Sequence, residues 1–220
     1  MLGIVCAALV WQTAGPPRLP EAAEKAALRA TLHVNNRAKS VDGSAVVITR
    51  DGPVVYMLTA AHVVDGAERV TVDIADAANP KRRRILGEAT VEKTAKAEDL
   101  ALLRIVVKDD APPALSLRKN APPKAPCDGF SLADEGTGAS VRAETIVAAP
   151  FVKRPGADTA ARCWKCEATP VPGRSGGPLV DGDGALVGIC SGGQGEFSYY
   201  THLDEIRAFL RRSGLDFLAE

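Results

Sequence analysis

The stretch Gly173-Arg174-Ser175-Gly176-Gly177-Pro178-Leu179-Val180 places a serine between glycines, shortly before an apolar run at residues 186–189. Glycine permits a tight backbone turn that larger side chains obstruct. Such a turn exposes the hydroxyl of Ser175 and points the N–H groups of Gly173 and Ser175 at one position, as an oxyanion hole requires. Because Gly-Ser-Gly-Gly also occurs in ordinary loops, the stretch is informative only together with a base and a carboxylate elsewhere in the chain.

A histidine and an aspartate stand in suitable places. Thr59-Ala60-Ala61-His62 follows the apolar run at residues 54–58, and Asp99 directly precedes another apolar run at residues 100–105. A serine hydroxyl is a weak nucleophile at neutral pH and needs a general base, and the base needs a shielded acceptor that fixes its tautomer. The order His62, Asp99, Ser175 therefore predicts a catalytic triad.

Other aspartates are weaker candidates for the acid. Asp65 is too close to His62 in the sequence, and Asp73 belongs to the alternating stretch at residues 69–74, where we expect it to face water. Asp99 stands at the edge of a nearly continuous apolar run, where a partly shielded carboxylate needs a hydrogen-bond donor such as an imidazole N–H. The sequence therefore favours Asp99.

The two remaining histidines are interpreted as structural. His33 lies in the middle of a predicted strand without a flanking motif, and His202 begins the predicted C-terminal helix. We also expect a turn at residues 42–44 and a loop over residues 151–161. The basic run at residues 81–84 is interpreted as a solvated hairpin tip.

The three motifs together resemble the signatures of the chymotrypsin-like (trypsin-fold) serine peptidases: Thr-Ala-Ala-His, Asp-Leu-Ala-Leu-Leu and Gly-Arg-Ser-Gly-Gly-Pro. The resemblance covers residues 30 to 210 and is greater to the bacterial HtrA/Deg-type peptidases than to the digestive trypsins. It implies an all-β fold of two packed six-stranded antiparallel β-barrels with a C-terminal helix. It also implies a triad in the cleft between the barrels, with the N–H groups of Gly173 and Ser175 as the oxyanion hole.

The resemblance also implies where a substrate binds. Ser191, Gly192 and Gly193 correspond to the segment that pairs with the substrate backbone in the family. Thr169, six residues before Ser175, corresponds to the floor of the specificity pocket. Because threonine is small and neutral, we expect a small or medium apolar substrate residue there and no strong preference for Lys or Arg.

Arg174 is the main departure from the family. Digestive members carry an aspartate at this position, which pairs with a new N-terminus after cleavage, and the HtrA-type relatives commonly carry asparagine. Activation by a buried N-terminal ion pair is therefore not expected for this chain. An arginine here is expected either to disturb the turn or to shape substrate access.

The expected organisation follows from the motifs and the composition of the connecting segments. It comprises a signal peptide (1–14), a linker with a short helix (15–28), a first β-barrel (29–110), an inter-barrel connector (111–126), a second β-barrel (127–201) and a C-terminal helix (202–220). No peptide-binding domain is expected after the protease unit.

Composition narrows the function classes. The apolar fraction of 46% is sufficient for a core, and the formal net charge of zero gives no basis for binding nucleic acid or a membrane surface. We expect no metal and no organic cofactor, a protein or peptide substrate, and no membrane span in the mature domain.

The cysteines and the N-terminus bear on localisation. The apolar N-terminal run followed by small residues resembles a secretory signal, so we expect export to a periplasmic or extracellular compartment, with a retained N-terminal anchor or a mis-set start as the alternatives. Removal of such a leader removes Cys6 and leaves four cysteines: Cys127, Cys163, Cys166 and Cys190. Four cysteines allow three disulfide pairings, and buried free thiols or a zinc site are the alternatives.

Two other functions compete with an active serine endopeptidase. A pseudoprotease would keep the fold and cleft as a peptide-binding module with little turnover, and Arg174 is its main support. An esterase would share the chemistry, but its usual Gly-x-Ser-x-Gly turn and the order Ser-Asp-His differ from this sequence.

Overall fold

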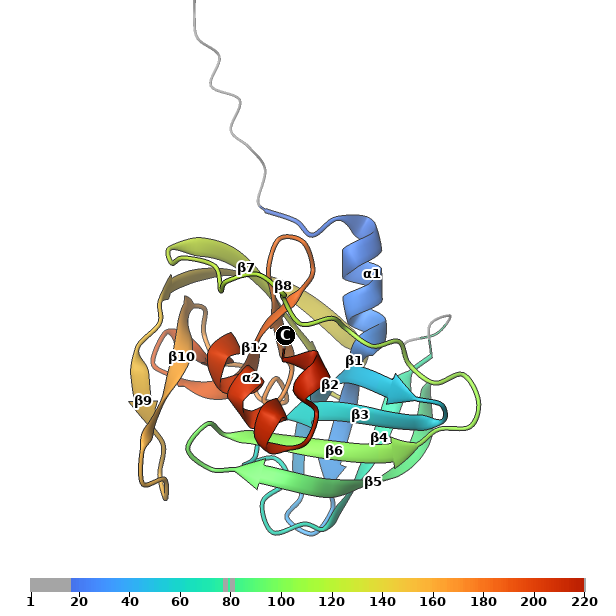
Figure 1. Ribbon diagram of the computed structural model, residues 1–220. Helices are drawn as coiled ribbons and strands as arrows, with labels where there is room; N and C mark the ends of the chain where they lie inside the picture. The colour runs from blue at the N-terminus through green and yellow to red at the C-terminus, as the bar shows by residue number, and fades with distance from the viewer. Residues whose placement is uncertain (1–16, 77–78, 80–81, 220) are drawn as a thin grey trace, which may run out of the picture.

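The first half of the chain forms a closed antiparallel barrel of six strands (Figure 1). The computed structural model describes residues 17–76, 79 and 82–219, so the signal peptide expected at residues 1–14 lies outside the described residues. Around the barrel the strands follow the order β1-β2-β3-β6-β5-β4. They are β1 (Thr31–Asn36), β2 (Val41–Asp51), β3 (Val54–Thr59), β4 (Arg69–Ala75), β5 (Arg83–Ala95) and β6 (Leu100–Val106).

Alternation of side chains explains how this barrel is filled. Successive side chains of a strand point to opposite faces, so every second residue enters the interior. Val55 and Met57 of β3 stand opposite Ile105 and Leu103 of β6, and all four belong to one buried apolar cluster. Leu58, on the other face of β3, packs into a different cluster, outside this barrel.

The second half of the chain closes into another six-stranded barrel. Its sheet has the order β13-β12-β11-β7-β8-β10-β9, and pairing between β13 and β10 closes the ring while β9 remains an added edge strand. The strands are β7 (Cys127–Asp134), β8 (Ala139–Ala148), β9 (Phe151–Lys153), β10 (Ala160–Glu167), β11 (Pro178–Val180), β12 (Leu186–Gln194) and β13 (Phe197–His202). The predicted fold class is therefore confirmed.

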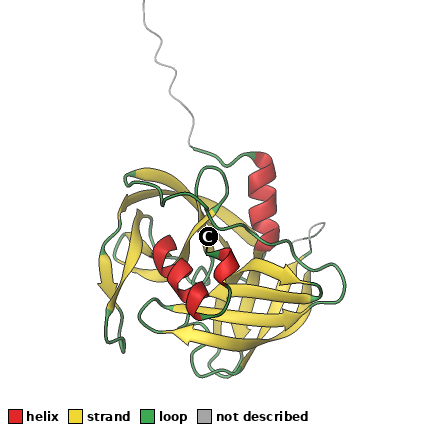
Figure 2. Ribbon diagram, in the orientation of Figure 1, coloured by secondary structure: helices red, strands yellow, loops and turns green. Residues whose placement is uncertain are grey.

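The helices lie outside the strands and complete the core between the barrels (Figures 1 and 2). α1 (Glu21–Ala30) precedes the first barrel, and α2 (Leu203–Arg212) follows the second, with a short 3₁₀ helix η1 (Asp216–Leu218) behind it. Ile206 and Leu210 of α2 share one buried cluster with residues from both barrels, such as Leu58 and Leu132. No helix in the described part of the chain has the length and apolarity needed to cross a membrane.

Residues 81–84 were expected to be solvated, and this is wrong for Arg83. Asp73 was expected to face water, and this is also wrong, because Asp73 is buried. Arg83 is mostly buried: its Nε donates to Asp73, and its Nη1 and Nη2 donate to the two oxygens of Asp134 at 2.9 Å each. Because Asp73 lies on β4 and Asp134 ends β7, Arg83 is an ionic clamp between the barrels. His33 also contacts Asp73, at 3.0 Å, and this hydrogen bond raises the pKa of His33.

Two segments expected to be irregular contain strand residues. Residues 42–44 lie within β2, whereas the loop expected over residues 151–161 is confirmed for residues 154–159 and is wrong at its two ends, which belong to β9 and β10. Backbone pairing with β1 and β10 overrides the local turn signal in each case, because Gly43 pairs with Val34 and Phe151 with Arg162.

The four cysteines of the described residues, Cys127, Cys163, Cys166 and Cys190, are free thiols. Burial raises the pKa of Cys190 to about 11 and that of Cys166 further. A raised pKa suppresses the reactive thiolate, so these two side chains act as small apolar groups of the core. No group of three or more His, Cys, Asp or Glu side chains within residues 17–219, apart from the undescribed 77–78 and 80–81, is placed to hold a metal.

Candidate active site

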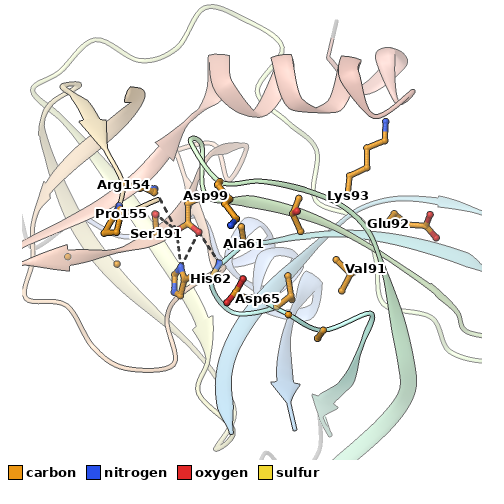
Figure 3. A pocket seen from close by; sticks show the side chains of 17 residues that line it. Ala61, His62, Asp65, Val91, Glu92, Lys93, Asp99, Arg154, Pro155 and Ser191 are labelled. Carbon is orange, nitrogen blue, oxygen red and sulfur yellow. Dashed lines mark hydrogen bonds and ion pairs between the residues drawn. The ribbon is translucent and has the colours of Figure 1, made fainter. Parts of the chain in front are cut away.

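Asp99 and His62 form a hydrogen-bonded pair at the mouth of the first barrel (Figure 3). His62 lies on the turn after β3, and Asp99 precedes β6, the strand hydrogen-bonded to β3. The backbone N–H of His62 donates to Asp99 Oδ1 at 3.0 Å, and Nδ1 lies 2.9 Å from Oδ2. Asp99 is 4% exposed, whereas the side chain of His62 is 46% exposed. With Nδ1–H donated to the buried carboxylate, Nε2 remains the accessible acceptor of the imidazole.

Two further side chains hold the carboxylate of Asp99. Ser191 Oγ donates a short hydrogen bond to Oδ2, and Arg154 Nε lies 3.7 Å from the same oxygen (Figure 3). A buried carboxylate is costly unless it is hydrogen-bonded or paired, and these contacts provide partners for Oδ2 besides the imidazole. The backbone of Asp99 has a φ of 54°, which a non-glycine residue adopts only when its surroundings enforce it.

Ser175 lies on the turn between β10 and β11. Arg174 N donates to Val171 O at 3.4 Å, and Gly173, the third residue of this turn, has a φ of 84°. A positive φ at the third position is typical of a type II turn and favours glycine there. Among the described residues, the N–H groups of Gly173 and Ser175 donate no hydrogen bond. They are therefore available to bind a negatively charged oxygen.

The two barrels bring Ser175 towards the turn that carries His62. Ser44 N of β2 donates to Ser175 O at 2.7 Å, and Ser44 Oγ donates to Gly173 O at 2.8 Å. The neighbouring Gly43 has no room for a side chain, because a Cβ would lie 2.7 Å from Val63 and 2.9 Å from Ser175 O. Within the described part of the chain, all hydrogen bonds of the His62 side chain go to Asp99 and none to Ser175. Hydrogen bonds to a nucleophile are often looser without substrate.

An open cleft of about 860 Å³ passes in front of His62 and Asp99. Ser191, Gly192 and Gly193, the residues expected to bind the substrate backbone, line this cleft. They lie at the end of β12. On one side this end pairs with β13, whereas on the other side the pairing of β12 with β11 stops at Ile189. This end of β12 therefore offers a free strand edge to the cleft.

A much smaller cavity of about 10 Å³ lies beside Ser175. Arg142, Pro170 and Tyr200 line it, and Pro170 packs against Gly193, where a Cβ would overlap the proline ring. Thr169, expected at the floor, is exposed and lines neither cavity; its carbonyl accepts a hydrogen bond from Arg142 Nη1 at 2.8 Å. Two charged residues therefore line this cavity: Arg174, and Arg142, which the sequence interpretation missed.

Arg142 leaves a faint signal in the sequence. It stands two residues before Glu144 in β8, so both side chains share one face of the strand, and Arg142 Nη2 donates to Glu144 Oε1 at 2.8 Å. A charged pair at positions i and i+2 of a barrel strand can indicate a polar site inside the barrel. Arg154 and Ser44 give no comparable signal, because their partners are distant in the sequence.

His33 and His202 lie outside the cleft and have structural roles, as expected. Burial lowers the pKa of His202 to about 4, and its Nδ1 accepts from the backbone N–H of Asp204, which caps α2. The ring also contacts Trp164, with 4.0 Å between the centroids. His62 is therefore the histidine of the described chain that lines the cleft.

Comparisons with known proteins agree with this geometry. A family model described as a trypsin-like peptidase domain matches residues 43–189. The fold is similar to the active form of the Rv3671c protease from M. tuberculosis, with a TM-score of 0.71 and 24% identity over 89% of this chain and 88% of that chain. It is also similar to the HtrA-type protease AlgW solved with a tripeptide, with a TM-score of 0.68 and 26% identity over 89% of this chain and 63% of that chain. No curated protein sequence gives a significant match.

Proposed function

Because this chain belongs to the trypsin-like peptidases and is a serine-type endopeptidase, we propose that it cleaves peptide bonds through a triad of His62, Asp99 and Ser175. The observation that carries this proposal is the buried Asp99 carboxylate, which accepts both the backbone N–H and the ring Nδ1–H of His62. This arrangement fixes the imidazole with Nε2 as a base. The order and elements of the three residues match the family signatures.

The proposed reaction passes through an acyl-enzyme. His62 Nε2 takes the hydroxyl proton of Ser175 as Oγ attacks the carbonyl carbon, and the N–H groups of Gly173 and Ser175 stabilise the oxygen that becomes negative. The imidazolium then protonates the leaving amine. Water enters, loses a proton to His62 and attacks the acyl carbon, which releases the second product and restores Ser175. Asp99 stays ionised and stabilises the imidazolium in both halves.

The free edge at the end of β12 supports binding of an extended peptide. Backbone groups at Ser191 and Gly193 are placed to pair with a substrate strand, a mode in which main-chain hydrogen bonds supply affinity. The similarity to AlgW, which was solved with a tripeptide, is consistent with this mode. A peptide bound along this edge would pass in front of His62, because the same cleft is lined by His62 and by β12.

The cavity beside Ser175 favours a small side chain before the scissile bond. Its volume of about 10 Å³ is close to that of one water-sized probe, and Arg142 places a cation at its wall. We expect peptide amides with Ala at this position to be cleaved about tenfold or more faster than those with Leu or Lys. A side chain that does not match the volume of a pocket typically costs about 1–3 kcal/mol of transition-state binding. Faster cleavage after Leu or Lys would contradict this preference.

Labelling with a fluorophosphonate tests the proposed function. We expect intact-mass analysis to show one adduct on the wild-type protein and none on Ser175→Ala, because the probe reacts with a serine activated by a base and an oxyanion hole. Peptide and ester substrates are assayed beside it, to separate a peptidase from an esterase. A folded wild-type protein that forms no adduct would contradict the proposal and favour a pseudoprotease.

A further inference from the structure

Arg174 lies between the two residues whose N–H groups form the proposed oxyanion hole, yet its side chain points away from the cleft. The residue is 5% exposed, and its guanidinium enters the interior of the second barrel. Nη2 donates to Ser131 O at 2.9 Å and to Ser131 Oγ at 2.8 Å. Nη1 donates to Glu135 Oε1 and to Ser140 Oγ, each at 3.1 Å. The expectation that this side chain disturbs the turn is therefore not matched by its contacts.

The acceptors form a rigid frame under the turn. Ser131 belongs to β7 and Ser140 to β8, and the two strands are paired along the whole of β7. Glu135 lies in the connection between them and also packs beneath Gly173, where a Cβ would come within 3.2 Å of the Glu135 side chain. A planar guanidinium with four hydrogen bonds to such a frame restricts the torsions of the residue that carries it.

A carboxylate in the exposed connection after β7 balances the charge of Arg174. Glu135 is its ion-pair partner, and Ser131 Oγ donates onward to Glu144, which also accepts from Arg142 and from Tyr200 Oη. Two arginines and two glutamates thus share one network below the turn. A buried cation requires such partners. The single ammonium group of a lysine cannot reproduce the several N–H donors of the planar guanidinium.

We propose that Arg174 is a positioning residue for the oxyanion hole: its guanidinium anchors, from inside the second barrel, the turn that presents the N–H groups of Gly173 and Ser175. This inference rests on the proposed function and adds the side chain that fixes the conformation of its oxyanion hole. Ser44 Oγ fixes the same turn from the first barrel through Gly173 O. The turn is therefore held from both barrels by side chains of this chain.

Arg174→Ala tests the inference. We expect kcat and the rate of fluorophosphonate labelling to fall about 100- to 1,000-fold, the usual effect of losing one oxyanion-hole donor. KM should change less than kcat, because the peptide edge of β12 is untouched, although Arg174 also lines the small cavity beside Ser175. Millimolar guanidinium should restore the labelling rate in a saturable manner, since the substitution leaves a space lined by Ser131, Glu135 and Ser140, whereas equal concentrations of NaCl or urea should not. Arg174→Lys should resemble Arg174→Ala.

The controls separate positioning from a purely structural role. Arg118→Ala removes another arginine with a carboxylate partner, Asp181, and should leave kcat unchanged. If Arg174→Ala does not fold, Glu135→Ala decides, because Glu135 is exposed and its loss should lower kcat about tenfold without unfolding the chain. Wild-type labelling rates in folded Arg174→Ala, or in Glu135→Ala, would overturn the inference. Activity loss that guanidinium does not restore would also overturn it. A wild-type protein that fails to label would instead contradict the proposed function.

Discussion

Ser175→Ala, His62→Ala and the double variant are each expected to lose about the same activity, on the order of 10⁶-fold in kcat. His62 and Ser175 act on one proton transfer, so either loss removes the whole step. The structure supports this coupling, because Asp99 fixes the tautomer of His62 and β2 holds Ser175 beside the His62 turn. The residual activity should reflect the oxyanion hole and substrate binding alone.

Single-turnover and steady-state assays on one peptide amide measure this prediction. Ser116→Ala is a matched control, since Ser116 is exposed in the connector between the barrels and should leave kcat unchanged. The triad is contradicted if the double variant loses the product of the two single losses, which would indicate independent roles. Substantial turnover by Ser175→Ala would point to another nucleophile.

The residues of the proposed triad could be selected from the sequence because their signals are local. His62 and Asp99 each adjoin an apolar run that becomes a barrel strand, and Ser175 stands among glycines whose turn geometry is encoded next to it. Strand pairing of β3 with β6 then brings the first two residues together with few alternatives. The two-barrel fold was predicted from the family resemblance that these local motifs carry.

The direction of the Arg174 side chain could not be predicted, because its partners are distant in the sequence. Its neighbours are glycines and a serine, which are compatible with a side chain pointing outward or inward. Its acceptors Ser131, Glu135 and Ser140 are 34 to 43 residues away and are assembled only when β7 and β8 form the barrel. Arginine side chains are mostly exposed in proteins, so the sequence favours an exposed Arg174. The tertiary structure instead buries it among hydrogen-bond acceptors.

Arg83 shows the same limit for the joint between the barrels. A run of basic residues usually marks a solvated surface, and Arg84 in this run is indeed exposed. Arg83 is the neighbour of Arg84 in β5, so its side chain lies on the opposite face of the strand, where it contacts Asp73 and Asp134. The charges that complete the ion pairs lie on two other strands, so the run alone contains no information about them.

Gly176→Ala is expected to disable the site through packing rather than chemistry. Gly176 has a φ of 86°, and a Cβ there would overlap Ser44 O and Thr59 Oγ1 and lie 2.9 Å from Ala60 N. These atoms cannot move aside easily, because Thr59 Oγ1 donates to Ser44 O at 2.7 Å and both residues belong to paired barrel strands. We expect a loss of unfolding free energy on the order of 4 kcal/mol, typical of overpacking combined with an unfavourable φ.

The same substitution should also lower the labelling rate of any folded fraction about 100-fold or more, because a displacement of about 1 Å at the nucleophile is enough for such a loss. Urea unfolding and fluorophosphonate labelling measure the two effects separately. Gly182→Ala is the matched control: its Cβ would meet no atom within 4 Å, and its φ is not in the left-handed region. It should stay within about 0.5 kcal/mol of the wild type. A Gly176→Ala protein with the wild-type urea midpoint and labelling rate would contradict this prediction. It would mean that the Ser175 turn lies farther from β2 and β3 than these distances indicate.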